Sequence, residues 1–396
     1  MPGTVTATLP GRQRSDTGYP GRMLWMTDTF GDHNGVSTVL RAVLREVRQR
    51  DLPVDLMICS DTAEPGDHLL VVKPVTDFSV PLYRHQPFRI PNYLSVQRQF
   101  RAGRYTRIMA STEGPMGLAA LWLKKRFSVE TSFFLHTDWM QFARDALSVG
   151  PTGLGYLEKA LRIYYRRYNS LFVLNSDQHA WLTDDLRFSP AKVHRTAHWA
   201  DPAFTDPRHG MDHGKFSFDP QRPVILYAGR ISREKGVMEL PGIYTLVRAY
   251  LPDVQFVVAG TGPAEEELKT AMPGAVFTGW IGHDLLPQLY RAADLLLLPS
   301  RFDTFSCVVL EALTCGLPVV AYNMKGPKDI LHDQVNGFLV ETAGEMAGRV
   351  VGYLLDPATQ YAMKEAALAR AAEYRAASIM DRLLSDAGIE TGGTQE

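Results

Sequence analysis

The sequence has few cysteines and no long apolar run, and both features narrow what the protein can be. Its 396 residues include only Cys59, Cys307 and Cys315. Three dispersed cysteines without a nearby His cluster make neither a disulfide framework nor a metal site, and they fit a reducing compartment. No apolar stretch reaches the roughly 18–20 residues that a membrane-spanning helix needs. We therefore expect a cytoplasmic protein without a membrane span.

The composition and the spread of charge indicate a globular protein whose two halves differ. Hydrophobic residues make up 45% of the chain and charged residues 21%, which is typical of a soluble globular protein. The net charge is −1, but residues 1–200 contain 25 Lys and Arg against 18 Asp and Glu, whereas residues 201–396 contain 17 against 25. Such asymmetry suggests that each half meets different partners.

Short apolar runs alternate with longer helical patterns along the whole chain. This alternation predicts βα units around parallel sheets, an α/β fold with two doubly wound domains. A stretch rich in Pro, Gly and Asp at residues 201–214 is typical of a linker. Residues 1–20 lack the apolar core of a secretory signal and are expected to be disordered. The predicted domains are 21–205 and 206–375, followed within 376–396 by a helix that returns to the first domain and a flexible tail.

Two cations follow an apolar strand near the start of the second domain. Pro223–Ala228 is predicted to be a buried strand, and Arg230 and Lys235 come soon after it. A guanidinium offers a fork of donors for phosphate oxygens and a lysine offers a point charge, so the pair suits a diphosphate. The alternative is a solvated helix start in which Arg233 and Glu234 pair locally.

Two further strand ends carry glycine or an aromatic residue. Gly260 and Gly262 follow the strand predicted at residues 254–259, and glycine lets a backbone approach a ligand closely. Trp280 and Ile281 follow the next predicted strand, where Trp280 could flank a nucleotide base. The alternatives are simple chain reversal for the glycines and packing at a domain interface for the tryptophan.

A polar loop and a short apolar helix follow the strand predicted at Leu295–Pro299. Thr304 or Ser306 is expected to cap this helix, whose free N–H groups suit a phosphate or a sugar hydroxyl. Glu311 lies about one and a half turns into the helix among apolar neighbours. A buried carboxylate needs a partner because its unpaired burial is expensive. Two ribose hydroxyls would serve, and the alternative is a salt bridge to a structural arginine.

These segments together resemble the retaining glycosyltransferases of family 4, the glycosyl transferases group 1, which have the GT-B fold. The resemblance runs from about Arg22 to Leu384. It rests on a glycine loop after the first strand, the Gly-Arg…Lys-Gly segment, the Gly-Thr-Gly-Pro turn and a loop-helix in the pattern Glu-x7-Glu. It implies two Rossmann-like domains that face each other across a cleft.

The resemblance implies a role for each matching position of the second domain. Arg230 and Lys235 are expected to bind the diphosphate, Glu311 the ribose, and the backbone at Trp280 and Ile281 the base.

The donor sugar is expected to contact a loop that departs from the family pattern. Asp303 replaces the usual Glu and Ser306 the usual Gly. The sugar-loop residues are Asp303, Thr304, Phe305 and Ser306.

The first half carries two more matching strand ends. Asn34, Gly35 and Val36 lie where the family's glycine loop closes over the donor phosphate, with Asn34 in place of one glycine; an ordinary βα turn is the alternative. A lone His after a strand is usually a structural hydrogen-bonding residue. The family, however, carries at the position of His136 a His that contacts the donor sugar near the reaction centre. The candidate acceptor-binding residues follow directly: Asp138 and Trp139.

Basic and aromatic residues gather in the first half. Residues 83–107 contain six arginines and no acid, and Lys124, Lys125 and Arg126 add to the charge. A solvated helix face with a loop is one interpretation. The other is a surface for a phosphorylated or lipid-linked acceptor or an anionic membrane, which would place the protein at the inner face of a membrane. No recognised module for nucleic acid accompanies the charge, so nucleic acid is not an expected partner.

The resemblance implies a retaining hexosyltransferase. The donor would be a UDP- or GDP-sugar, the acceptor a hydroxyl of a glycan, lipid or small molecule, and the catalytic residues His136, Arg230 and Lys235. The leaving phosphate is expected to help deprotonate the acceptor, so no enzymic base is named. Because no Asp-x-Asp pair occurs, neither a metal nor another cofactor is expected. The alternatives are another GT-B enzyme, such as a sugar-nucleotide epimerase or an inverting transferase, or a weakly active nucleotide-sugar-binding protein.

Overall fold

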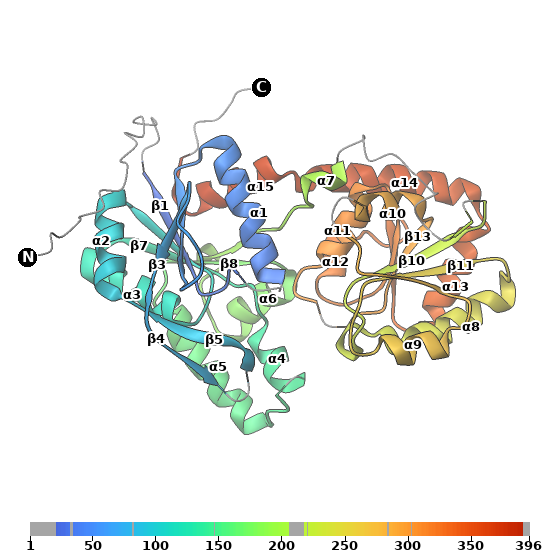
Figure 1. Ribbon diagram of the computed structural model, residues 1–396, viewed down its shortest axis with the longest axis horizontal. Coiled ribbons are helices and arrows are strands. Elements are labelled where there is room, and N and C mark those ends of the chain that lie inside the picture. The colour runs from blue at the N-terminus through green and yellow to red at the C-terminus, as the bar shows by residue number, and fades with distance from the viewer. Residues whose placement is uncertain are drawn as a thin grey trace, which may run out of the picture.

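The computed structural model describes residues 21–31, 35–80, 83–145, 147–205, 218–219, 221–282, 285–301 and 303–390. Asn34, residues 1–20, which were predicted to be disordered, and most of the predicted linker lie outside these residues. The described residues form two parallel sheets, each with helices on both faces, and the two units lie side by side (Figure 1). This arrangement confirms the predicted α/β fold of two doubly wound units. No helix in the described part of the chain is both long and apolar enough to cross a membrane.

The first sheet has seven strands, all parallel to their neighbours. Alternate residues of the central strand point to opposite faces, so Trp25 packs into one apolar core and Leu24 into another. In spatial order the strands are β3 (Leu69–Val72), β2 (Val54–Cys59), β1 (Met23–Thr27), β6 (Arg107–Ala110), β7 (Glu130–Phe134), β8 (Ser170–Val173) and β9 (Val193–Arg195). The helices of one face are α1 (Gly35–Arg50) and α15 (Ala376–Asp386), and those of the other are α2 (Tyr93–Gly103), α3 (Pro115–Phe127) and α5 (Pro151–Tyr165).

The second sheet has six parallel strands and the same layering. Its strands are β12 (Val276–Gly279), β11 (Gln255–Ala259), β10 (Val224–Ala228), β13 (Leu295–Leu298), β14 (Val319–Tyr322) and β15 (Gly337–Val340). The helices of one face are α10 (Leu286–Ala292), α11 (Cys307–Thr314) and α14 (Pro357–Ala371), and those of the other are α8 (Leu240–Tyr250), α9 (Glu265–Ala271) and α13 (Ala343–Leu354). In both sheets the order reverses at the first strand, between β1 and β6 and between β10 and β13. Such a reversal opens a crevice at the carboxyl ends of the strands.

One interpretation of the arginine-rich residues 83–107 was a solvated helix face with a loop, but the structure shows a strand followed by a helix. Residues Tyr83–Pro91 form β5, which pairs in an antiparallel hairpin with β4 (Pro74–Val80), and α2 follows. Phe78 and Phe88 stack across the hairpin with ring centroids 5.4 Å apart. Cross-strand aromatic pairs of this kind stabilise a hairpin. The arginines in this segment obscure the alternation of apolar and polar residues that would predict a strand.

The end of the chain crosses from the second sheet to the first. Helix α15 lies against α1, where the Nη2 of Arg50 is 2.7 Å from the Oδ1 of Asp381 (Figure 1). The first connection between the units includes α7 (Pro202–Thr205). Its buried Phe204 packs edge-on against Tyr290 of the second unit. Two crossings of the chain therefore join the units, although the exact domain limits remain a prediction.

A buried carboxylate caps α3 from another element. Asp28, just after β1, accepts a hydrogen bond of 3.0 Å from the N–H of Met116 and another from the hydroxyl of Thr112. The N-cap residue itself is Gly114, which has no side chain to do this. Burial raises the pKa of Asp28 to about 6, against the lowering effect of those two hydrogen bonds.

We predict that Asp28→Asn changes how stability depends on pH. The folded state holds the Asp28 proton up to about pH 6, whereas the unfolded chain releases it near pH 4. Between these values the folded wild type therefore loses stability as pH rises, by up to about 3 kcal/mol, and the Asn variant does not. Urea unfolding of both proteins from pH 4 to 7 measures the difference. The exposed Asp253→Asn is the control, and a constant difference between Asp28→Asn and wild type would contradict the prediction.

Candidate active site

A cavity at the carboxyl ends of β10, β11 and β12 gathers residues from four of the predicted segments. Its volume is about 260 Å³, and it is called the β10 cavity here. Tyr290, which the sequence analysis did not single out, also lines it. The predicted residues that line it are Arg230, Gly260, Trp280, Ile281 and Glu311.

Glu311 is a half-buried acid at the wall of the β10 cavity. Its Oε2 accepts a hydrogen bond of 3.1 Å from the hydroxyl of Tyr290. Burial raises its pKa to about 7, with the Tyr290 hydrogen bond acting in the opposite direction. The salt bridge to a structural arginine, considered as an alternative, does not form among the described residues. Glu311 is thus a half-satisfied acceptor that faces a cavity, which suits hydroxyl donors.

Arg230 lies at the mouth of the β10 cavity and is only loosely held. Its side chain is 69% exposed, and its Nη1 is 3.9 Å from a carboxylate oxygen of Glu234. Arg233 pairs with Glu267 at 2.6 Å, so the local pair of Arg233 with Glu234, which the alternative required, does not form among the described residues. Because exposed ion pairs contribute little, Arg230 can turn to an anionic ligand at small cost.

Lys235 and Asp303 meet across two of the predicted segments. The Nζ of Lys235 is 3.8 Å from the Oδ2 of Asp303. Burial raises the pKa of Asp303, while the charge of Lys235 lowers it. The shortened carboxylate of the sugar loop therefore lies beside one of the two predicted diphosphate cations.

The two glycines after β11 are required by the contact between neighbouring loops. A Cβ on Gly260 would stand 1.9 Å from the carbonyl oxygen of Gly229, and one on Gly262 would stand 2.2 Å from that of Ile231. Gly260 also has a φ of 131°, which few L side chains tolerate. Gly260 lines the β10 cavity as well, whereas Gly262 is explained by the loop contact alone.

The sugar loop between β13 and α11 is held from the first unit. The carbonyl of Thr304 accepts a hydrogen bond of 2.7 Å from the Nδ2 of Asn175, and the ring of Phe305 packs edge-on against His198 at 5.0 Å. Ser306 occupies the N-cap position, but its side chain makes no capping hydrogen bond, contrary to expectation. The N–H groups of Cys307 and Val309 at the start of α11 donate instead to the backbone carbonyls of Phe305 and Ser306.

His136 lies just beyond the end of β7 and is buried. Its ring packs against Phe134, with centroids 4.2 Å apart, and against His198 at 5.7 Å. Burial lowers its pKa to about 3, so the ring is neutral near pH 7. Its Nε2 has no hydrogen-bond partner among the described residues. His198, which the sequence analysis missed, is also kept neutral, since burial lowers its pKa well below the usual value.

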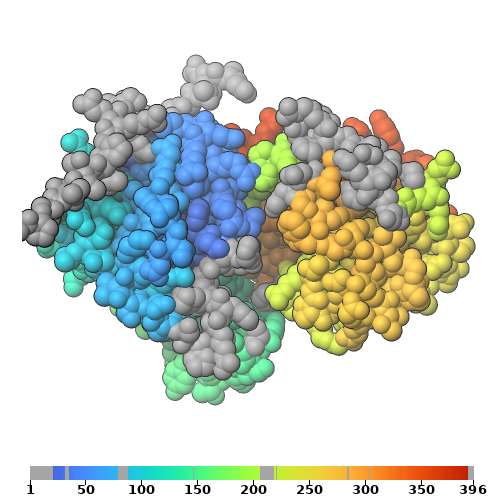
Figure 2. Space-filling model, viewed as in Figure 1, coloured from blue at the N-terminus to red at the C-terminus, as the bar shows by residue number. Residues whose placement is uncertain are grey.

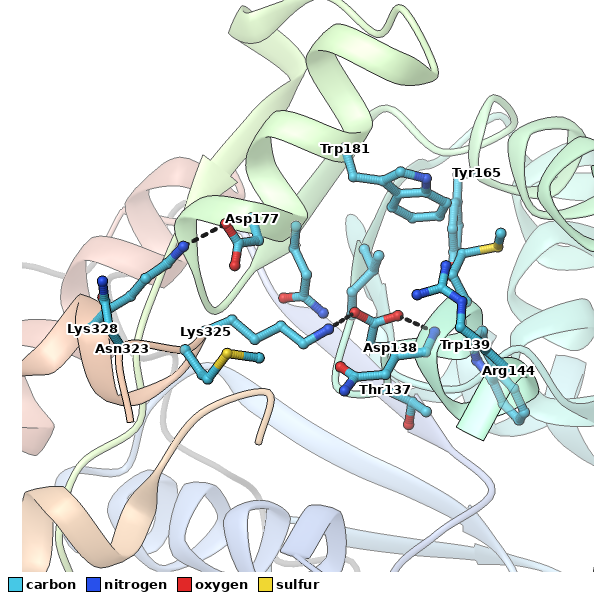
Figure 3. Close-up of a pocket in the computed structure, with 15 residues that line it drawn as sticks. Thr137, Asp138, Trp139, Arg144, Tyr165, Asp177, Trp181, Asn323, Lys325 and Lys328 are labelled. Atoms are coloured by element: carbon cyan, nitrogen blue, oxygen red, sulfur yellow. Dashed lines mark hydrogen bonds and ion pairs between the residues drawn. The ribbon is translucent and has the colours of Figure 1, made fainter. Parts of the chain in front are cut away.

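A second cavity lies between the two units beside Asp138 (Figure 3). Its volume is about 390 Å³, and it is called the Asp138 cavity here. The Oδ1 of Asp138 caps α4 (Trp139–Asp145) through the N–H of Gln141, and its Oδ2 pairs with Lys325 of the second unit. Trp139 also lines this cavity, so both predicted acceptor residues face it.

A second ion pair crosses between the units in the same place. The Nζ of Lys328, in α12 (Pro327–Ile330), is 2.7 Å from Asp177, in α6 (Ser176–Ala180). The space-filling view shows the two units meeting along a central seam (Figure 2).

Gly35 and Val36 open α1, and a Cβ on Gly35 would meet no atom within 4 Å. No group of His, Cys, Asp or Glu able to hold a metal occurs within the described ranges.

Two facing doubly wound units, with cavities at the strand ends and between the units, define the GT-B class of architecture. Two family models match the chain: "Glycosyltransferase Family 4" over residues 33–204 and "Glycosyl transferases group 1" over residues 222–356. Together they span both units, and the chain belongs to glycosyltransferase family 4.

Individual relatives agree with this membership. An alpha-D-kanosaminyltransferase of Streptomyces kanamyceticus is 32% identical over 205 residues, which cover 48% of this chain and 53% of the relative. A GDP-mannose-dependent alpha-mannosyltransferase of Mycobacterium tuberculosis is 26% identical over 341 residues, or 83% of this chain and 86% of the relative. The match thus spans about half the length of the first relative and most of the second.

Solved structures share the fold over nearly the whole chain. Sucrose-phosphate synthase from Thermosynechococcus elongatus matches with a TM-score of 0.72 at 18% identity. The match covers 92% of this chain and 98% of the synthase chain. HepE of Anabaena, solved in complex with UDP, has a TM-score of 0.70 at 16% identity with the same coverage. At these identities the likeness establishes the fold.

Proposed function

We propose that the protein transfers a hexose-type sugar, with retention, from a UDP- or GDP-sugar to a hydroxyl of a glycan, lipid or small molecule. The β10 cavity carries this proposal, because it places Arg230, Trp280 and Glu311 around one space. A diphosphate needs a cation and a ribose needs an acceptor, and the cavity offers both in Arg230 and Glu311. The kinship to a GDP-mannose-dependent enzyme and the UDP complex of a protein with the same fold support a nucleotide-sugar donor.

The donor would extend from the β10 cavity toward the sugar loop. The exposed ring of Trp280 would flank the base, since at 73% exposure it packs at no domain interface. Glu311 would accept the ribose hydroxyls, and Arg230 and Lys235 would bind the diphosphate. The sugar would then lie near Asp303, which Lys235 contacts. The start of α1, at Gly35 and Val36, would close over the phosphates together with Asn34.

The reaction exchanges one bond to the anomeric carbon for another. The acceptor oxygen forms the new glycosidic bond, the bond from the anomeric carbon to the diphosphate oxygen breaks, and the acceptor proton leaves with the nucleoside diphosphate. Arg230 and Lys235 would stabilise the charge that develops on the leaving oxygen, and no metal is expected for this task. His136, kept neutral by burial, would offer its unpaired Nε2 to the donor sugar. NMR of the product's anomeric carbon distinguishes retention from inversion, and epimerised donor would indicate an epimerase.

We predict that Arg230→Ala and Lys235→Ala each lower turnover by about 10²–10³-fold. Each variant removes a cation that would stabilise the negative charge developing on the leaving diphosphate. Release of UDP or GDP from a sugar nucleotide, with or without acceptor, measures the rate. The matched control is Arg233→Ala, because Arg233 is equally exposed but pairs with Glu267. Near-wild-type rates in both variants would refute the assignment.

We predict that binding of a sugar nucleotide weakens as pH falls through about 7. Ribose hydroxyls donate to the ionised form of Glu311, whose pKa burial has raised to about 7. Below that pH the affinity should approach a tenfold loss per pH unit, since a proton must first leave. Calorimetry with UDP-glucose and GDP-mannose at pH 5.5–8 measures this effect. Glu311→Gln should bind weakly at every pH, and a pH slope equal to that of the wild type would disprove the role.

We also propose that the first unit makes peripheral contact with an anionic membrane. Leu94 on α2 and Leu118 on α3 are 77% and 49% exposed, and α2 presents Arg98 and Arg101 on its exposed side. Exposed apolar residues beside cations are what an anionic lipid surface attracts. Not all arginines of the segment are free, because Arg107 pairs with Glu130.

Co-sedimentation with vesicles of phosphatidylglycerol and phosphatidylcholine tests this contact. We expect binding at low salt that falls as salt rises, and a loss of at least severalfold in Arg98→Glu/Arg101→Glu. Arg104 is left unchanged because it ends α2 in a left-handed conformation. The control reverses two exposed arginines of the second unit, Arg222 and Arg349. Equal binding by both double variants, or none by the wild type, would remove the proposal.

A further inference from the structure

The Asp138 cavity adjoins the place where the donor sugar would lie. Asp138 follows His136 by two residues, and its partner Lys325 precedes Gly326. A Cβ on Gly326 would stand 3.0 Å from the carbonyl oxygen of Asp303, so this loop packs directly on the sugar loop. A molecule in the Asp138 cavity would therefore lie close to the loop that the proposed donor sugar contacts.

The charges around the Asp138 cavity leave one cation without a partner. Lys325 pairs with Asp138, and Lys328 pairs with Asp177, so these four groups balance. Arg144, on α4, also lines the cavity, and no hydrogen bond or ion pair of its side chain occurs within the described residues (Figure 3). The cavity therefore has a net single positive charge, held on a guanidinium that suits a carboxylate or a phosphate.

Two side-chain amides of the same lining each leave one polar atom without a partner among the described residues. Gln178 is 4% exposed, and while its Oε1 accepts a hydrogen bond from the N–H of Leu174, its Nε2 donates to no described group. The Oε1 of Gln141 is likewise buried without a donor. Buried polar atoms of this kind are costly unless a ligand or water satisfies them. One unpaired donor and one unpaired acceptor together match the hydroxyls of a sugar.

Aromatic rings complete the wall of the cavity. Tyr165 and Trp181 meet edge-on with centroids 6.4 Å apart, and both line the space on the side of Arg144 (Figure 3). Flat apolar rings with polar groups at their edges favour a ring-shaped ligand that carries hydroxyls. At about 390 Å³ the cavity is within the usual size range of small-molecule sites.

We propose that the Asp138 cavity binds the acceptor, and that this acceptor carries an acidic group, a carboxylate or a phosphate, on its sugar ring. Arg144 binds the acidic group, Gln178 and Gln141 bind hydroxyls, and the Lys325–Asp138 pair keeps the carboxylate of Asp138 from repelling the anion. This inference rests on the proposed transfer reaction, because it names the acceptor class of the same site.

Ligand-observed NMR with three matched monosaccharides tests the proposal. Glucuronate, glucose 6-phosphate and glucose are titrated into wild type, Arg144→Gln and Arg144→Lys, each with and without UDP. We expect at least one of the two acids to bind wild type about tenfold to a hundredfold more tightly than glucose. Arg144→Gln should lose that preference while keeping its affinity for glucose, and Arg144→Lys should restore part of it. The control is Arg126→Gln, an exposed arginine of α3 outside the cavity.

The two acids also distinguish the two sources of negative charge. Preference for glucuronate assigns a carboxylate, and preference for glucose 6-phosphate assigns a phosphate. Equal binding of all three sugars, an unaffected Arg144→Gln, or inorganic phosphate binding as tightly as glucose 6-phosphate would each overturn the proposal. UDP and GDP binding, followed by thermal shift in the same variants, tests the donor site separately. If wild type binds neither UDP nor GDP, the proposed function is refuted, whether or not glucuronate or glucose 6-phosphate binds.

Discussion

The sugar loop between β13 and α11 is the constraint on which the candidate site depends. Three consecutive residues hold it in three ways: Asp303 lies near Lys235, the carbonyl of Thr304 accepts a hydrogen bond from Asn175, and Phe305 packs on His198. Two of these contacts come from the first unit. A movement of one unit against the other would therefore displace the loop, so the geometry of the donor site depends on how the two units are placed relative to each other.

Burial tunes the protonation of the site more than local charge does. Glu311 and His136 are both shifted toward their neutral forms, and burial is the first cause in each case. A neutral histidine can hydrogen-bond a sugar without attracting the diphosphate, and an acid poised near pH 7 can become an acceptor when hydroxyls arrive. Asp28, just after β1, follows the same rule, although there it caps a helix.

Prediction from sequence succeeded where a role depends on local pattern and failed where it depends on distant partners. The parallel sheets, the strand end before Arg230 and the helix that carries Glu311 follow from apolar runs and turn residues. Tyr290 and His198 were missed because each acquires its role from a residue far away in the sequence. The β4–β5 hairpin was missed because its arginines mask its alternation. For Gly262, whose role in donor binding stays a prediction, the structure adds a close contact with the loop at Ile231 that the sequence could not reveal.

The charge of the two halves is reversed at the Asp138 cavity. The first half is positive overall and the second negative, yet at the Asp138 cavity the first unit supplies Asp138 and Asp177 and the second supplies Lys325 and Lys328. The overall charges therefore do not explain these pairs. Each lysine from the acidic unit is paired with an aspartate from the basic unit, so these four charges of the cavity lining cancel. The positive charge of Arg144 is not cancelled by them. A neutral acceptor would gain nothing from that arrangement, whereas an acidic one would be attracted to the single unbalanced charge.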